Sequence, residues 1–308
     1  MRLFLYRPGA LGDALLCAPL LGGLGRAGER PEVTLAAHGG AATLLAASGL
    51  VSEALDQDSP LLTALFADSD ASDRLARLGQ FDAALAWLAD PDGLVLANLR
   101  RLAPGRAAVA PSRPELAAGL SVASYLASSL APLGLAPAAL PLPPLLRPAP
   151  ADDGWAASLL AELPAGPSVA LHPGSGGARK NWHAAGFAAA ACILASRYTV
   201  LLVVGPADDL AARAVSELCP ARLWPLAGLP VGRLAAVLAR CSAFVGNDSG
   251  VGHLAALLGT PVVSLFGPTD RRLWRPWGEK VTVLSWAAGH ASLAPETVVQ
   301  AVRRAVGN

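Results

Sequence analysis

The segment FVGNDSGVGHLA (residues 244–255), continued by GTP (259–261) and FGPTD (266–270), decides the fold. It predicts a short apolar strand, a polar turn, the start of a helix, a second apolar strand and another polar turn. The start of a helix leaves backbone N–H groups without partners and carries the positive end of the helix dipole. Such a site favours an anion, most often a phosphate. Asp248 or Ser249 is equally typical of a plain helix cap, so this segment alone leaves both interpretations open.

Apolar strands alternate with helices on both sides of this segment, which predicts parallel sheets covered by helices on both faces. A chain of 308 residues fits two domains. The Pro-rich stretch 132–150 is the best boundary between them. We therefore expect an α/β protein with an N-terminal domain over 1–145, a C-terminal domain over 150–290 and a final helix within 291–308 that turns back toward the N-terminal domain. Strands are expected at 3–6, 33–36, 51–55, 83–87, 107–110, 168–171, 199–204, 223–225 and 281–284, besides the two in the opening segment.

Composition excludes several classes of protein. The net charge of +1 gives no general attraction to nucleic acid. The uncharged stretch 116–146 is long enough to span a bilayer, but its five prolines argue against that, so we expect a buried helix to about Ala131 followed by a linker. The four cysteines are far apart, which predicts small buried side chains in a reducing compartment, with neither disulfides nor a metal site.

Two further polar segments follow predicted strands. GALGD (9–13) follows the first strand, and Asp13 is expected to cap a helix from Ala14 that Pro19 kinks, or to act as a general base. HPGSGGARKNW (172–182) follows the strand at 168–171, and its glycines and Lys180 suit a phosphate, although a flexible basic turn is the alternative. Ligands of doubly wound sheets bind at the carboxyl ends of strands, where these segments lie.

The pattern Gly250-x-Gly252-x-x-Ala255, with Asp270 further on, formally matches a dinucleotide-binding fingerprint. Its glycines follow the polar Asn247–Asp248 pair, so they fall within the first helical turn instead of the turn before it. This placement argues against an NAD-dependent oxidoreductase, which stays as an alternative of another class beside a non-catalytic nucleotide-binding module.

The motifs GALGD (9–13), HPGSG (172–176) with KNW (180–182), NDSG (247–250) with His253, and LFGPTD (265–270) occur in one order and at one spacing along the chain. Together they resemble glycosyltransferase family 9, the ADP-heptose heptosyltransferases of bacterial lipopolysaccharide assembly. The resemblance implies a GT-B fold, with two doubly wound Rossmann-like domains facing across a cleft. The N-terminal domain would bind the acceptor, and the C-terminal domain would bind the nucleotide-sugar.

The resemblance also implies a reaction and the residues that carry it. An inverting transfer would move a heptose from ADP-heptose to a hydroxyl of a cell-envelope glycolipid, or another sugar between related partners. Asp13 matches the proposed catalytic base, Lys180 the residue that meets the pyrophosphate, and Gly9 and Gly12 the acceptor side. No metal or other cofactor is implied. The remaining expected donor-binding residues are Ser175, Gly176, Asp208, Asp248, Ser249, Gly250, His253 and Thr269.

The sequence departs from the family pattern at one position, where the family often has a Glu that contacts the ribose. Ala207 stands there, and Asp208 or Asp209 is the candidate replacement, which leaves the nucleotide open. For the whole chain, we expect a monomeric cytoplasmic enzyme with peripheral contact to the inner face of the plasma membrane. Its partners would be a nucleotide-sugar and a glycolipid or glycan, and not nucleic acid.

Overall fold

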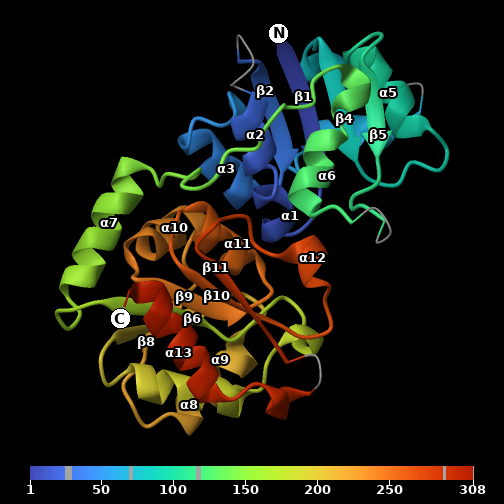
Figure 1. Cartoon of the computed structure of the whole chain (residues 1–308). Helices are drawn as coiled ribbons and strands as arrows, with labels where there is room; N and C mark the ends of the chain where they lie inside the picture. Colours follow the sequence, from blue (N-terminus) through green and yellow to red (C-terminus); the bar gives the residue numbers. More distant parts are fainter. Residues whose placement is uncertain (25–29, 69–71, 116–118, 287–288, 308) are drawn as a thin grey trace. The chain divides into compact units, whose positions relative to one another are not determined.

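A computed structural model describes residues 1–24, 30–68, 72–115, 119–286 and 289–307 (Figure 1). The chain divides into two compact units, the first from Met1 to Pro141 and the second from Leu142 onward. The point of division lies inside the Pro-rich stretch 132–150. Each unit holds one sheet of parallel strands, and each is described here by itself.

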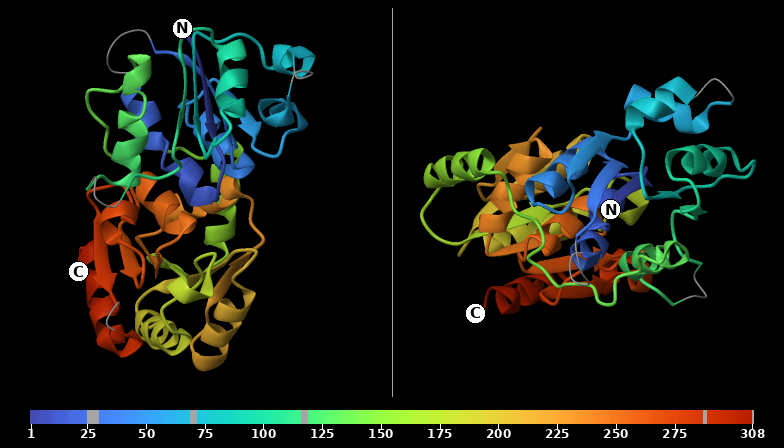
Figure 2. Two further views of the ribbon diagram at one scale, coloured as in Figure 1. Left: turned by 90° about the vertical axis from the view of Figure 1, so that its right-hand side faces the viewer. Right: turned by 90° about the horizontal axis from the view of Figure 1, so that it is seen from above.

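The sheet of the first unit has the strand order β3-β2-β1-β4-β5. The helices α1, α2, α3 and α6 lie on one face of this sheet, and η1, α4 and α5 lie on the other (Figure 2). The strands are β1 (Arg2–Arg7), β2 (Glu32–Ala37), β3 (Glu53–Asp56), β4 (Ala83–Trp87) and β5 (Ala107–Ala110). The helices are α1 (Leu11–Leu15), α2 (Ala18–Leu24), α3 (Gly39–Ala47), η1 (Pro60–Phe66), α4 (Ser72–Leu78), α5 (Leu94–Leu102), α6 (Val122–Ser128) and η4 (Ala131–Leu133).

The sheet of the second unit has the order β11-β10-β9-β6-β7-β8. Helices α8, α9 and α13 pack on one face, and α7, α10 and α11 pack on the other (Figure 1). The strands are β6 (Ser168–His172), β7 (Thr199–Val204), β8 (Trp224–Ala227), β9 (Ala243–Asn247), β10 (Val262–Phe266) and β11 (Val281–Ser285). The helices are α7 (Pro150–Ala161), η5 (Ala178–Lys180), α8 (Ala184–Leu194), α9 (Asp209–Leu218), α10 (Val231–Arg240), α11 (Gly250–Leu257), α12 (Arg271–Trp274), η6 (His290–Ser292) and α13 (Pro295–Val306).

Two neighbouring strands of the second sheet, β9 and β10, are buried along their whole length. Every residue of β9 and β10 is buried, as the continuous apolar runs in the sequence require when helices cover both faces. Val245 and Leu265 pack with Phe187 of α8 and Val302 of α13 in one core. Helix α13 thus packs within the second unit, and the expectation that it turns back toward the N-terminal domain stays a prediction.

Each sheet reverses its strand order beside its first strand. In the first unit the reversal lies between β1 and β4, and in the second it lies between β6 and β9. Segment 9–13 follows β1, while segments 172–182 and 247–249 follow β6 and β9. These positions are the switch points at which doubly wound sheets bind ligands, so the predicted fold places the polar segments as expected.

The helix after β1 differs from the prediction. It starts at Leu11 and ends at Leu15, so Asp13 is its third residue and not its cap. The Asp13 Oδ2 atom instead accepts the N–H of Ala10 at 3.1 Å. Pro19 does not kink a helix but lies in the first turn of the separate helix α2, where a missing N–H costs nothing.

The uncharged stretch forms a shorter helix than predicted. Helix α6 begins after Ser121, whose hydroxyl accepts the N–H of Ser124. The sequence predicts a helix from Glu115, but Glu115 is not helical, and residues 116–118 lie outside the described residues. Within the part of the chain that the structure describes, no helix is long and apolar enough to cross a membrane.

The prediction for the cysteines is wrong for one pair. Cys192 of α8 and Cys219, directly after α9, are joined in a disulfide because the two helices pack side by side and bring their Cα atoms to 5.8 Å. Cys17 and Cys241 are buried free thiols, as expected. Burial raises the pKa of Cys17 to about 12 and that of Cys241 to about 11, so both thiols stay protonated.

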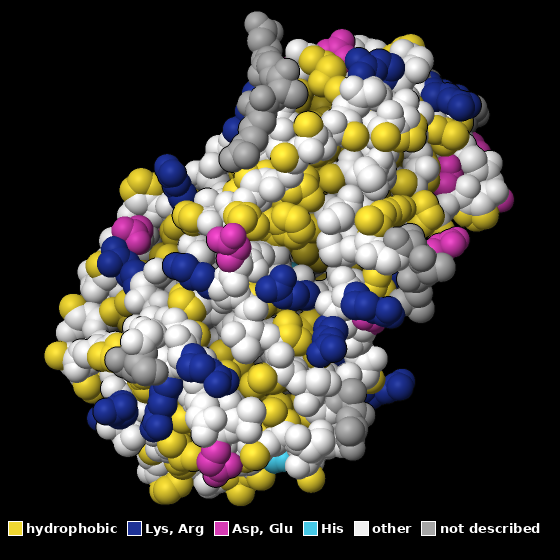
Figure 3. Space-filling model, in the orientation of Figure 1, with side chains coloured by type: hydrophobic (Ala, Val, Ile, Leu, Met, Phe, Trp, Pro, Cys, Tyr) yellow, Lys and Arg dark blue, Asp and Glu magenta, His cyan; other side chains and the backbone are white. Residues whose placement is uncertain are grey.

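Figure 3 shows Lys and Arg side chains on the visible face among hydrophobic and uncharged ones, with a few acidic groups between them. The net charge of the whole chain is +1.

Replacing Leu265 by Ala should lower the free energy of unfolding by about 2–5 kcal/mol, because it leaves a cavity at a fully buried position of β10. Urea unfolding followed by tryptophan fluorescence would measure the change. Leu210 is 86% exposed on α9 and offers a matched control. Leu210→Ala should change the stability by less than about 0.5 kcal/mol. Equal effects of the two substitutions would contradict the packing described for β10.

Candidate functional site

A buried histidine joins three loops at the switch point of the second unit. His172 ends β6 and is 2% exposed. Its Nε2 atom lies 2.8 Å from Oδ2 of Asp208, which precedes α9, and its Nδ1 atom lies 3.2 Å from Oγ of Ser249, which precedes α11. We call His172, Lys180, Asp208, Asp248 and Ser249 the switch-point site.

Asp208 faces inward. The residue is 7% exposed, and its carboxylate also accepts the N–H of Gly205 at 3.1 Å. The hydrogen bond with His172 holds the pKa of Asp208 below its ordinary value of 3.8, against the opposite effect of burial. Asp209, the first residue of α9, is exposed and leaves its carboxylate on the surface. Contact of either residue with a ribose stays a prediction.

Gly174 is needed for this arrangement. A Cβ atom at position 174 would collide with the carboxylate of Asp208. The close approach lets the loop after β6 fold over the start of α9, and only a residue without a side chain permits it.

A buried asparagine ties the two ends of the same loop to β9. The Oδ1 atom of Asn247 accepts the N–H of Trp182 at 2.9 Å, and its Nδ2 atom donates to the carbonyl of Pro173 at 2.8 Å. Inside the loop, the Ser175 hydroxyl bonds to Oδ1 of Asn181 at 2.5 Å and to the carbonyl of Gly177 at 2.9 Å. Ser175 therefore stabilises the loop, whereas Gly176 lies exposed on it.

Lys180 lies above the start of α11. Its Nζ atom is 3.4 Å from both the carbonyl oxygen and Oδ2 of Asp248. The Lys180 side chain is 35% exposed, while that of Asp248 is 6% exposed. The pair is long and the lysine is partly solvated, so the ion pair is weak and its ammonium group is accessible to a ligand.

Helix α11 begins at this site. The Ser249 hydroxyl accepts the N–H of Gly252 at 3.4 Å, while Gly250 at the first helical position is partly exposed. The first turn of a helix has N–H groups that lack intrahelical acceptors, and these favour an anion. His253 is buried in the same helix.

The loop after β10 contributes one polar side chain of note. The Thr269 hydroxyl is buried and has no hydrogen-bond partner among the residues that the structure describes. The neighbouring Asp270 caps α12 and pairs with Arg272 at 2.7 Å. Hydrogen bonds from Arg272 hold the pKa of Asp270 below its ordinary value. This carboxylate is therefore engaged locally, which further weakens the dinucleotide interpretation.

The first unit presents a second candidate group, Asp13 of α1, the helix that follows β1. The guanidinium of Arg7, which is 1% exposed, donates from Nη2 to Oδ1 of Asp13 at 2.8 Å. Gly9 has a φ of +143°, and a Cβ atom there would press on Asp13. The carboxylate is thus fixed in direction while its side chain keeps 28% exposure, which suits a base that must reach a substrate proton. Gly12, also predicted on this side, is partly exposed in α1.

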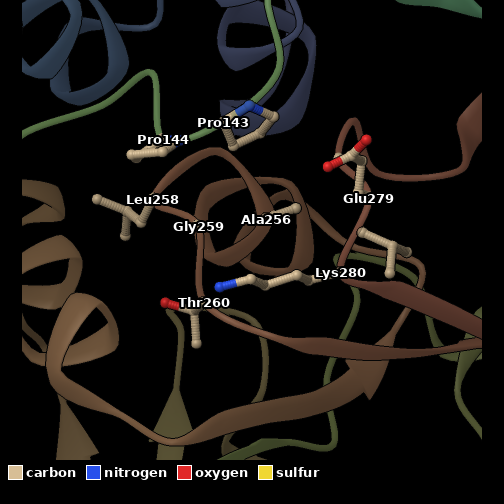
Figure 4. Close-up of a pocket in the computed structure, with 10 residues that line it drawn as sticks. Pro143, Pro144, Ala256, Leu258, Gly259, Thr260, Glu279 and Lys280 are labelled. Carbon is tan, nitrogen blue, oxygen red and sulfur yellow. The ribbon is translucent and has the colours of Figure 1, made fainter.

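A cavity of about 180 Å³ lies at the amino ends of strands β10 and β11, whereas the switch-point site lies at the carboxyl ends of the strands (Figure 4). Pro143 and Pro144 line it together with Gly259 and Thr260, which precede β10, and with Lys280, which precedes β11. The protein's second lysine therefore lies at the amino ends of the strands and away from the switch-point site.

Four residues of the switch-point site are among those predicted from the sequence, and their role in donor binding stays a prediction. His172 and Asn247 were not among the predicted site residues, although each is a polar residue at the end of an apolar strand. That position was the available signal. No group of three or more His, Cys, Asp or Glu side chains within the described ranges could hold a metal ion.

Solved structures share this architecture from end to end. A family 9 glycosyltransferase from Veillonella parvula has a TM-score of 0.81 at 18% identity, covering 99% of this chain and 97% of its own. The Escherichia coli ADP-heptose lps heptosyltransferase II has a TM-score of 0.78 at 20% identity, covering 99% and 98%. At such identities the likeness establishes the fold alone, and that fold is the GT-B fold of glycosyltransferases.

Sequence similarity narrows the class. The model of glycosyltransferase family 9 (heptosyltransferase) matches residues 140–300, more than half of the chain, and this range includes the whole switch-point site. The chain belongs to glycosyltransferase family 9. It is also similar to lipopolysaccharide heptosyltransferase 3 of Escherichia coli K12, at 40% identity over 104 residues. That match covers 31% of this chain and 29% of the relative, so the chain aligns with less than a third of the relative's length.

Replacing Gly174 by Ala should destabilise the loop after β6 by about 1–3 kcal/mol, because the new methyl group collides with Asp208. Thermal unfolding with and without ADP would show both the lower stability and weaker nucleotide binding. Gly177→Ala is the matched control, since a Cβ atom there meets nothing within 4 Å. If Gly174→Ala behaves like Gly177→Ala, the close approach of the loop to Asp208 is wrong.

Proposed function

We propose that the protein transfers a heptose from ADP-heptose to a hydroxyl of a lipopolysaccharide-type glycolipid. The observation that carries this proposal is the switch-point site. There a partly exposed Lys180 lies above the start of α11, and the buried Asn247 holds the loop that bears it. Family membership and the names of the similar heptosyltransferases supply the sugar and the acceptor class.

The charges of the switch-point site suit the leaving group of this reaction. Breaking the bond between the sugar and the phosphate leaves negative charge on a nucleoside diphosphate. The Lys180 ammonium and the N–H groups at the start of α11 would stabilise this charge where it develops. The Thr269 hydroxyl, buried without a partner among the described residues, would gain one from a bound nucleotide. In this scheme no step requires a metal ion.

Asp13 would act as the base of a single displacement that inverts the anomeric centre. Its carboxylate would take the proton of the acceptor hydroxyl as the oxygen attacks the anomeric carbon. The ion pair with buried Arg7 fixes one carboxylate oxygen, and the N–H of Ala10 bonds the other. In this proposal the first unit activates the acceptor and the second unit binds the donor.

The cellular location and the oligomeric state of the enzyme are part of the same proposal. A glycolipid acceptor implies work in the cytoplasm at the inner face of the plasma membrane, with peripheral contact and as a monomer. A donor with another base or sugar is the nearest alternative, because the ribose contact of Asp208 or Asp209 is open. An NAD-dependent oxidoreductase is less well supported, since Asp270 is already paired with Arg272.

Asp13→Asn should reduce heptose transfer by about 10²–10⁴-fold, the usual contribution of a general base, and leave ADP-heptose binding unchanged. Transfer to a lipopolysaccharide-core acceptor would be followed by mass spectrometry, and donor binding by calorimetry. Asp92 is exposed in the same unit, and Asp92→Asn serves as the control with native activity. Native transfer by Asp13→Asn would refute the assignment of the base. A protein that binds ADP-heptose but transfers nothing, before or after substitution, would be a non-catalytic module.

A further inference from the structure

The series of hydrogen bonds from Asp208 through His172 to Ser249 ends at the position where the proposed function places the diphosphate. We propose that His172 takes up a proton when the nucleotide-sugar binds, and that this proton turns the Ser249 hydroxyl from the histidine toward the diphosphate. The inference rests on the proposed function, because it needs an anion at the start of α11. It assigns His172 and Asp208 as positioning residues that act through Ser249.

In this proposal the unliganded imidazole is neutral, and the partner of Nε2 fixes its tautomer. Asp208 is ionised and can only accept, so the Nε2 atom of His172 must carry a hydrogen in both the neutral and the charged ring. In the neutral ring the Nδ1 atom is then an acceptor. The Ser249 hydroxyl, 3.2 Å away, must donate to it.

This direction of the hydroxyl is unfavourable for a bound phosphate. With its hydrogen on His172 and with Gly252 donating to its oxygen, Ser249 has only lone pairs to present at the site. Phosphate oxygens are acceptors too, so the contact would be repulsive. A proton from solvent on Nδ1 reverses the bond. Nδ1–H then donates to Oγ, and the Ser249 hydrogen is free to point at a phosphate oxygen, while no bond between heavy atoms changes.

The charges around His172 favour this uptake when the donor arrives. Asp208 at the start of α9 and Asp248 after β9 are negative, and Lys180 in the loop after β6 pairs with Asp248. The diphosphate adds negative charge beside a ring that is 2% exposed, where salt screens little. Lys180 can turn to the ligand, but it remains a third exposed at the rim. The buried imidazolium, paired with Asp208, is the compensating charge closest to Ser249.

Calorimetry in two buffers of different ionisation enthalpy tests the inference. The probe is ADP-heptose, because its diphosphate is esterified on both sides and has no proton to exchange near neutral pH. The full chain should show a binding enthalpy that depends on the buffer, corresponding to uptake of up to one proton per donor. Donor binding without proton uptake would overturn the inference and leave the proposed function standing. Absence of any binding of ADP-heptose would overturn both.

Substitutions test whether His172 is the group that takes up the proton. His172→Gln should bind ADP-heptose at least several-fold more weakly and without proton uptake, and Asp208→Asn should show reduced uptake. His290 is exposed, and His290→Gln should keep the wild-type uptake. Unchanged uptake in His172→Gln would contradict the assignment and point to another group, such as His253 of α11. If His172→Gln is unstable, the uptake of the wild type and that of Asp208→Asn still decide the question.

Discussion

The side chain of Asn247 is the contact on which the switch-point site depends. It is fully buried at the end of β9 and bonds to both ends of the loop that follows β6. One amide thereby holds Lys180 above α11 and Trp182 beneath the loop. In any other conformation this buried amide would lose its hydrogen bonds, which costs free energy. The loop is therefore fixed before a ligand arrives.

In the proposed function, the site binds an anion although two carboxylates lie beside it. Each carboxylate has a cationic or hydrogen-bonding partner, Asp208 with His172 and Asp248 with Lys180. The two pairs differ in burial, and this difference separates their roles. Lys180 is partly exposed, whereas His172 is enclosed and contacts Ser249. In the proposed function, Lys180 turns to the ligand and His172 acts through Ser249.

The sequence predicted the strands and the switch points because apolar runs and polar strand ends are local signals. Strands β4, β5 and β7 lie at their predicted bounds. Two features required contacts between distant parts of the chain and were missed. Asp208 bonds to His172 across 36 residues, and Cys192 lies beside Cys219 through the packing of α8 on α9. Spacing along the chain does not reveal such pairs. A third difference is local, because α1 starts before Asp13 and the carboxylate bonds back to Ala10.

A crystal structure of the full chain with ADP-heptose would show where the diphosphate binds. We expect the diphosphate at the start of α11, within hydrogen-bond distance of Ser249 Oγ and Lys180 Nζ, with the Lys180–Asp248 contact opened. A diphosphate bound elsewhere on the second unit, for example beside Lys280 at the amino ends of the strands, would contradict this expectation.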